Sequence, residues 1–275
     1  MVSRIYGELG PLNKLPLIIF LGVWVIGCPK RIPAGSLEAI SPADLLALIA
    51  RQEQQIFSVK GQARLQVEGP SGKGTVTLFV AVARPRWIHL ESLGFFGQPQ
   101  AILVSDGKTF GLFQAQESKY YRGPASPENI SRFLPIVLPG HELVTILLGG
   151  APRIRGEATA LRLLRDPAAY ELQLTEGPVT QTLIIDPLAH RVIKSDVRGI
   201  DGYDLFFDDF ERDVAPALPQ KIRLSALAAS NTLELRYQDV EINQKLEVSL
   251  FSQRPPAGVP IVDVDSRGNP VVTGR

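Results

Sequence analysis

The 275-residue chain has one cysteine, three histidines and almost no net charge, with 29 Lys and Arg against 28 Asp and Glu. A single cysteine cannot close an intramolecular disulfide, so a packed core must stabilise the fold. Binding to nucleic acid needs a clustered basic face, whereas the charges here are interspersed and sum to +1. The composition therefore argues against a nucleic-acid partner.

Motifs for catalysis and for metal binding are also scarce. His89, His141 and His190 are far apart, and no His/Glu pair has the spacing of a zinc site. Residues 69–75 lack the glycine spacing of a phosphate loop, and no Gly-x-Ser-x-Gly motif occurs. The acidic stretch at 201–213 does not match an EF-hand loop and fits a strand with one solvated face. We therefore expect no enzyme, no cofactor and no metal site.

The first 27 residues resemble an export signal. Arg4 and Lys14 stand against a single Glu8, and an uncharged apolar run follows at 15–27. This run is too short to cross a bilayer, which takes about 20 apolar residues. Its length suits the apolar region of a signal peptide.

The run ends in Val25-Ile26-Gly27-Cys28, which resembles the lipobox of bacterial lipoproteins. The resemblance implies cleavage before Cys28 and attachment of lipid to its thiol, a strong nucleophile as the thiolate. The alternative is a short membrane anchor with a buried, inert cysteine. Pro29 follows Cys28 in place of the Asp linked to inner-membrane retention in some bacteria, which favours the outer membrane. We expect a signal peptide at 1–27 and a linker behind acylated Cys28 at 28–40.

The rest of the chain begins with apolar residues at helical spacing. Apolar and polar residues then alternate, which is typical of strands. Ser41 and Pro42 predict the start of a helix over 42–57. Helices are also predicted at 126–137, where Pro135 and Pro139 kink or stop the helix, and at 140–148. Alternating apolar residues predict strands at 63–67, 76–82, 86–92, 100–105, 108–114, 118–122, 158–165, 169–175, 179–186, 189–198, 202–211, 219–225, 231–242 and 259–264.

This order of elements predicts a mainly β fold with helices, of the α+β class. A sheet whose two halves flank a helical insertion must cover its apolar face, and the predicted helices are the natural cover. We expect residues 41–264 to form a strongly curved antiparallel half-barrel with a helical lid over an apolar cavity. Residues 265–275 are predicted to be an irregular tail.

Several segments resemble the LolA/LolB superfamily of lipoprotein carriers and receptors. Residues 79–122 share an Arg-Pro-Arg strand start, a Leu-Gly loop, an Asp-Gly hairpin and a Tyr-Tyr strand. Residues 133–152 resemble its helical insertion, and residues 218–251 resemble its closing strands. The resemblance implies a cavity for the acyl chains of lipoproteins, which an anchored member receives from a soluble periplasmic carrier and releases into the outer membrane.

The same resemblance suggests site residues. Leu93 falls at the place of the receptor's working loop, whereas Phe95 and Phe96 replace residues that are usually polar there. This loop either touches membrane or cargo, or folds back beneath the lid. We expect the cavity, unless the same side chains fill a dry core, to be lined by Phe79, Trp87, Leu90, Ile102, Leu112, Ile130, Phe133, Leu134 and Leu147.

The sequence thus predicts a lipid-anchored protein that binds acyl chains and takes part in lipoprotein or lipid delivery at the periplasmic face of the outer membrane. The alternative is an envelope scaffold or interaction module with a closed core. An envelope hydrolase is disfavoured because no catalytic constellation is visible.

Overall fold

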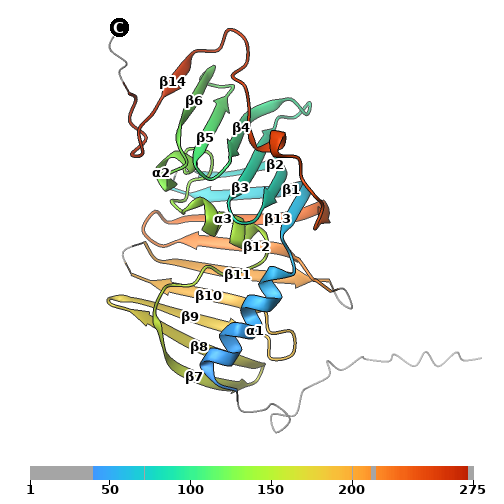
Figure 1. Ribbon diagram of the computed structural model, residues 1–275, viewed down its shortest axis with the longest axis vertical. Helices are drawn as coiled ribbons and strands as arrows, with labels where there is room; N and C mark the ends of the chain where they lie inside the picture. Colours follow the sequence, from blue (N-terminus) through green and yellow to red (C-terminus); the bar gives the residue numbers. More distant parts are fainter. Residues whose placement is uncertain (1–39, 71, 200, 212–214, 272–275) are drawn as a thin grey trace, which may run out of the picture. The chain divides into compact units, whose positions relative to one another are not determined.

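The computed structural model describes residues 40–70, 72–199, 201–211 and 215–271. Cys28, the signal peptide and all but the last residue of the linker lie outside the described residues, so their assignments stay predictions. The described chain forms a single 14-stranded sheet in the order β14-β6-β5-β4-β3-β2-β1-β13-β12-β11-β10-β9-β8-β7. The predicted fold class is confirmed, because this sheet is curved, open and, apart from its last strand, antiparallel, with few helices (Figure 1).

The strands form two meanders in which sequence neighbours pair antiparallel. The first comprises β1 (Ser58–Gly69), β2 (Gly72–Ala83), β3 (Trp87–Leu93), β4 (Pro99–Ser105), β5 (Thr109–Gln114) and β6 (Lys119–Pro124). The second comprises β7 (Glu157–Arg165), β8 (Ala168–Glu176), β9 (Val179–Ile185), β10 (Val192–Arg198), β11 (Tyr203–Phe210), β12 (Pro219–Ala226) and β13 (Asn231–Ile242).

Strands β1 and β13 join the two meanders. They pair antiparallel over ten residue pairs, with Leu65 opposite Leu235, and a register shift follows Gln62. Gly61 beside this shift has φ +152°, and a Cβ there would lie 2.0 Å from the carbonyl oxygen of Asp239. Glycine is needed at this position because the two backbones approach so closely.

The last strand departs from the antiparallel pattern. β14 (Ile261–Asp263) lies within the predicted strand at 259–264 but pairs parallel with β6. A short 3₁₀ helix, η2 (Val248–Phe251), precedes it. This C-terminal segment crosses one face of the first meander, where the Leu250 carbonyl lies 2.6 Å from His89 Nδ1 and the Pro260 carbonyl accepts from Tyr120 N. After this crossing, β14 lies at the edge of the sheet and runs in the same direction as β6.

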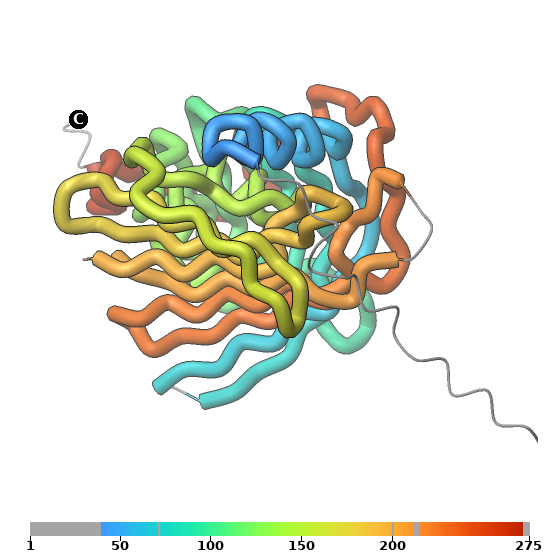
Figure 2. The backbone as a smooth tube through the Cα atoms, turned by 90° about the horizontal axis from the view of Figure 1, so that it is seen from below, coloured from blue at the N-terminus to red at the C-terminus, as the bar shows by residue number. Residues whose placement is uncertain are grey.

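The first helix covers the opposite face of the sheet. α1 (Pro42–Gln54) begins after Ser41, whose hydroxyl accepts a hydrogen bond from Asp44 N at 3.1 Å. Leu45 and Ile49 are fully buried one turn apart and belong to the same core as the sheet. Figures 1 and 2 show α1 lying across the sheet near β8 to β11. We call the covered side the inner face.

The second helix is shorter than predicted. α2 (Pro127–Ile130) ends well before residue 137, and residues 131–139 form turns and irregular chain up to α3 (Gly140–Leu147). Pro135 lacks a backbone N–H and disfavours helical geometry at the residue before it, so a regular helix cannot continue. We call residues 127–148 the lid and residues 131–139 the lid loop.

Candidate functional site

A small cavity lies between the inner face and the lid. Its volume is about 40 Å³, and every residue around it is Leu or Ile. The sheet and the lid provide Leu65, Leu78, Leu90, Leu134, Ile136, Leu143, Ile146, Leu147, Ile222, Leu224, Leu233 and Leu235. Apolar cavities of this kind stay dry because a water molecule would find no hydrogen-bond partner.

The structure brings together only part of the predicted lining. Leu90, Leu134 and Leu147 line the cavity, whereas Leu112 and Ile130 are buried elsewhere in the same core and Phe133 packs against it half-buried. The remaining three, Phe79, Trp87 and Ile102, lie on the outer face.

Strand alternation explains this division. Leu78 and Val80 are buried toward the lid, so Phe79 between them points outward, where its ring contacts His89 at 5.4 Å. Trp87 likewise packs on Phe251 of the C-terminal segment, with ring centroids 5.2 Å apart. The period of two was visible in the sequence and would have placed these side chains correctly. The same period would have found the missed leucines and isoleucines of β1, β12 and β13.

The turn between β3 and β4 presents two phenylalanines to solvent. Gly97 N donates to the Gly94 carbonyl at 2.9 Å, so Phe95 and Phe96 occupy the two corner positions of a four-residue turn. Gly97 has φ +79°, the left-handed geometry that suits glycine after such a turn. Phe95 is 96% exposed and Phe96 88% exposed, with their rings 5.1 Å apart. The loop is therefore not folded beneath the lid.

Leu93 differs from its two neighbours. It is the last residue of β3, half-buried, and pairs with Thr77 on β2. Its side chain thus lies at the base of the turn, while Phe95 and Phe96 form the tip.

A charged cluster fastens the far end of the lid to α1. The Glu53 carboxylate accepts from Ala151 N at 3.1 Å and pairs with Arg153 at 2.9 Å, with a side chain only 10% exposed. Arg84 donates to the carbonyls of Glu53 and Ile56. Burial raises the pKa of Glu53, and the nearby Arg153 partly offsets this rise.

The turns of the sheet divide between its two ends. Because neighbouring strands run antiparallel, the β1–β2, β3–β4, β10–β11 and β12–β13 turns lie at one end, which we call the Phe95 end. The β2–β3, β9–β10 and β11–β12 turns lie at the other, which we call the Glu53 end because Arg84 of the β2–β3 turn contacts Glu53 there. The lid loop reaches the Phe95 end, where Asn231 donates to the Pro135 carbonyl at 3.0 Å.

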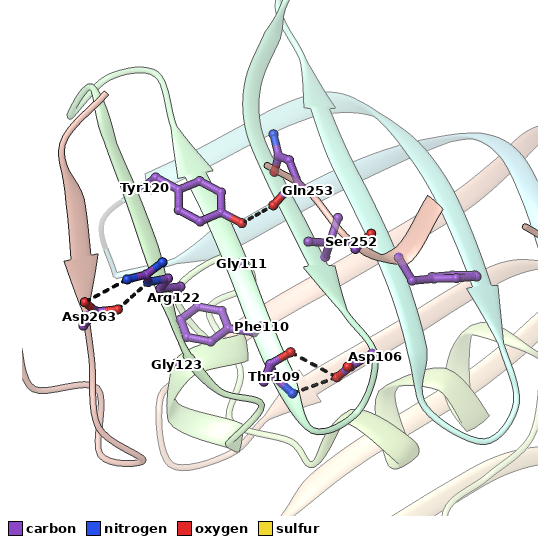
Figure 3. A pocket seen from close by; sticks show the side chains of 12 residues that line it. Asp106, Thr109, Phe110, Gly111, Tyr120, Arg122, Gly123, Ser252, Gln253 and Asp263 are labelled. Atoms are coloured by element: carbon purple, nitrogen blue, oxygen red, sulfur yellow. Dashed lines mark hydrogen bonds and ion pairs between the residues drawn. The ribbon is translucent and has the colours of Figure 1, made fainter. Parts of the chain in front are cut away.

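A larger cleft of about 410 Å³ lies on the outer face beside the C-terminal segment (Figure 3). Its main polar groups bond to one another across the cleft. The Tyr120 hydroxyl donates to the Gln253 carbonyl at 2.9 Å, and Arg122 pairs with Asp263 of β14. A Cβ at Gly111 would lie 2.0 Å from the Tyr120 hydroxyl, so glycine makes room for this ring. These contacts fasten the C-terminal segment to the sheet.

Charged side chains elsewhere pair with each other. In the acidic stretch, Asp204 pairs with Arg198 at 2.6 Å and Asp209 with Arg236 at 2.8 Å. Among the residues that the structure describes, no group of three His, Cys, Asp or Glu could hold a metal ion. Within the same residues, no helix is long and apolar enough to cross a membrane.

Comparisons with known proteins show the fold. No protein-family model matches the chain, and no curated protein matches it. A DUF1329 family protein from Desulfovibrio piger superposes with a TM-score of 0.56 at 11% identity, covering 76% of this chain and 96% of that one. A domain described as an outer membrane lipoprotein-sorting protein from Vibrio parahaemolyticus gives 0.53 at 11% identity, covering 80% and 97%. A LolA superfamily protein from Nitrosomonas europaea gives 0.49 at 15% identity, covering 78% and 99%.

At these identities the first two matches establish a shared fold. The predicted architecture, a strongly curved antiparallel sheet with helices over one face, is therefore confirmed.

Proposed function

We propose that the protein is a lipid-anchored envelope protein that binds acyl chains beneath its lid. It takes part in lipoprotein or lipid delivery at the periplasmic face of the outer membrane, where it receives cargo from a soluble carrier. The observation that carries this proposal is the cavity between lid and sheet, which is walled by leucine and isoleucine alone. Such a wall suits a saturated hydrocarbon chain and offers nothing to a polar ligand.

The lid must move for cargo to bind. Ligand cavities span roughly 300–1,000 Å³, whereas this one measures about 40 Å³. Each buried methylene gains about 0.8 kcal/mol, so ten of them gain on the order of 8 kcal/mol. That gain can offset the separation of lid and sheet, and the cavity would close again after release.

The small volume is also what favours a second candidate, a scaffold lipoprotein with a closed core. Titration with a fluorescent long-chain fatty acid separates the two candidates. A chain starting at Ser36 retains every described strand and the buried core. The carrier proposal expects saturable one-to-one uptake that palmitate reverses, and Leu90→Phe should abolish it by filling the cavity. No uptake by the unaltered chain would favour the scaffold.

The exposed turn supports a role at a membrane. Fully burying a phenylalanine gains about 1.5–3 kcal/mol, so Phe95 and Phe96 together can hold the turn in a bilayer interface. We expect the Phe95→Ser, Phe96→Ser double variant of the chain from Ser36 to lose at least tenfold in vesicle affinity, by roughly 1.4 kcal/mol per tenfold. Phe57→Ser is the matched control, because Phe57 is also exposed (46%) but lies at the Glu53 end. Equal losses in both variants would remove the turn from the mechanism.

The anchor at Cys28 needs its own test. We expect cells grown with labelled palmitate to label the full-length protein and not its Cys28→Ser variant, because the thiol is the attachment point. Label retained by Cys28→Ser would contradict the lipobox assignment.

A further inference from the structure

A second crevice lies next to the cavity beneath the lid. It measures about 120 Å³ and sits between the lid loop and the turns at the Phe95 end. Its apolar walls include Pro135, Val137 and Leu138 on one side and Ala226, Ala228 and Ala229 on the other. Ile136 lines both this crevice and the cavity beneath the lid. The Ile136 side chain therefore forms part of the wall between the two spaces.

The lid loop has few polar ties at this wall, where Leu134, Ile136 and Leu138 are instead buried in the core. Pro135 and Pro139 have no backbone N–H, and the Ile136 N–H donates within the loop to the Leu134 carbonyl at 2.6 Å. The described tie between residues 134–138 and the sheet is the exposed hydrogen bond from Asn231 to the Pro135 carbonyl. Exposed hydrogen bonds of this kind contribute little, because water replaces them readily.

The other end of the lid is held more firmly. The buried Tyr237 hydroxyl donates to the Leu147 carbonyl at 2.6 Å. A few residues further along the chain, the Glu53 carboxylate binds Ala151 N and the Arg153 side chain. The polar ties between lid and sheet are thus fewer at residues 134–138 than at the end of α3, so that opening at the lid loop breaks mainly apolar contacts.

The rim of the crevice carries exposed apolar side chains beside the exposed carboxylate of Asp201. Val137 is 57% exposed and Leu227, in the β12–β13 turn, 44% exposed. Both lie at the end of the sheet that carries the exposed Phe95 and Phe96. A hydrocarbon chain arriving at this rim would meet apolar side chains before it met the cavity.

We propose that an acyl chain enters the cavity through this crevice, with Ile136 as the gate that swings aside. This inference rests on the proposed function, which supplies the acyl chain, and adds the path and the gating residue. The ligand is a single saturated chain lying between the lid loop and the β12–β13 turn, with its head group left at the rim of the crevice.

Stopped-flow uptake of a pyrene-labelled long-chain fatty acid tests the path. The experiment uses the full-length Cys28→Ser chain, which cannot be acylated at that position. Ala228→Trp narrows the crevice from its exposed side without touching the core. We expect association and dissociation both to slow by at least about tenfold with an unchanged Kd, because a higher barrier acts in both directions. Ile136→Val, a smaller gate, should speed both steps.

The matched control is Ala257→Trp, which places the same ring at an exposed alanine in the C-terminal segment. If Ala228→Trp and Ala257→Trp both take up the probe at the unaltered rate, the path is wrong while the binding function stands. If the unaltered chain takes up no probe at all, the proposed function fails and this inference fails with it.

Discussion

The two ends of the sheet hold the same lid by different means. At the Glu53 end, a buried carboxylate, two arginines and backbone groups join α1 to the chain after α3. At the Phe95 end, the described polar tie between residues 134–138 and the sheet is one exposed hydrogen bond, and the surrounding side chains are largely apolar. Buried polar contacts fix a geometry, whereas an apolar contact can separate and reform around a ligand of similar chemistry. The comparison suggests a lid with a fixed end and an opening end.

The largest expected effect concerns the fixed end. Arg153→Ala leaves the Glu53 carboxylate buried without its ionic partner, and we expect the free energy of unfolding at neutral pH to fall by about 3–5 kcal/mol. Urea denaturation measures this loss. Arg162→Ala is the control, because Arg162 is 73% exposed and its pair with Glu171 is long at 3.9 Å; the control should lose no more than about 1 kcal/mol. Equal losses would show that the Glu53 cluster does not fasten the lid.

The same variant should respond to pH in a defined direction. Because burial raises the pKa of Glu53, the folded protein holds this proton more tightly than the unfolded chain. Glu53 therefore favours folding below the ordinary glutamate pKa, and this contribution is lost as pH rises through the raised value. Without Arg153 the pKa of Glu53 rises further, so the deficit should be largest at neutral pH and shrink toward about pH 4. A deficit that grows on acidification would contradict this assignment.

The next prediction distinguishes leucines that line the cavity from leucines elsewhere in the core. Leu90 and Leu103 pair on neighbouring strands, both fully buried, but only Leu90 lines the cavity. We expect Leu90→Ala and Leu103→Ala each to lose about 2–5 kcal/mol in urea denaturation. Only Leu90→Ala should bind the fluorescent fatty acid more tightly, because it enlarges the space beneath the lid. Tighter binding by Leu103→Ala alone would place the ligand elsewhere.

Smaller effects are expected from removing either of two hydrogen bonds to the lid backbone, one buried and one exposed. Tyr237→Phe leaves the buried Leu147 carbonyl unpaired and should lower the free energy of unfolding by about 1–3 kcal/mol. Asn231→Ala removes an exposed bond and should lower it by less than about 1 kcal/mol, while speeding fatty-acid uptake. The opposite ranking in uptake rates, with Tyr237→Phe the faster, would move the opening to the other end of the lid.

The smallest effect on stability is expected at the exposed loop. Leu93→Glu should leave the free energy of unfolding within about 1 kcal/mol but impair insertion of acylated cargo into vesicles, because a carboxylate resists the bilayer interface. Leu188→Glu is the control, since Leu188 is 66% exposed in the β9–β10 turn at the Glu53 end. Unchanged transfer in Leu93→Glu would remove Leu93 from the mechanism.

The strands and the curved sheet could be predicted because their signals are local. Alternation such as Leu78, Val80 and Val82, and the Asp106-Gly107 hairpin, depend on neighbours in the chain and mark each strand. The helix predicted at 126–137 ends at Ile130, earlier than its apolar stripe, and Pro135, which the sequence marks as a kink or stop, lies in the irregular chain that follows. Parallel pairing of β14 depends on how residues 243–260 cross the outer face, which no local pattern encodes.

The candidate site was less predictable than the fold. Its lining comes from β1, β2, β3, β12, β13 and the lid, so register and lid position decide which leucines meet. Ile136 lies in a segment that was assigned to a helix, and its place between two spaces emerges only when the lid loop meets the β12–β13 turn. The charged cluster joins Glu53, Arg84 and Arg153, which lie far apart in the sequence without a shared motif.

Hydrogen–deuterium exchange of the full-length Cys28→Ser chain, with and without a saturating long-chain fatty acid, tests the central claim most directly. If one end of the lid opens, free protein should exchange fast at residues 131–139 and slowly at 144–153, and the fatty acid should slow exchange in the first segment alone. Fast exchange at 144–153, or protection by the fatty acid that leaves 131–139 unchanged, would contradict the account.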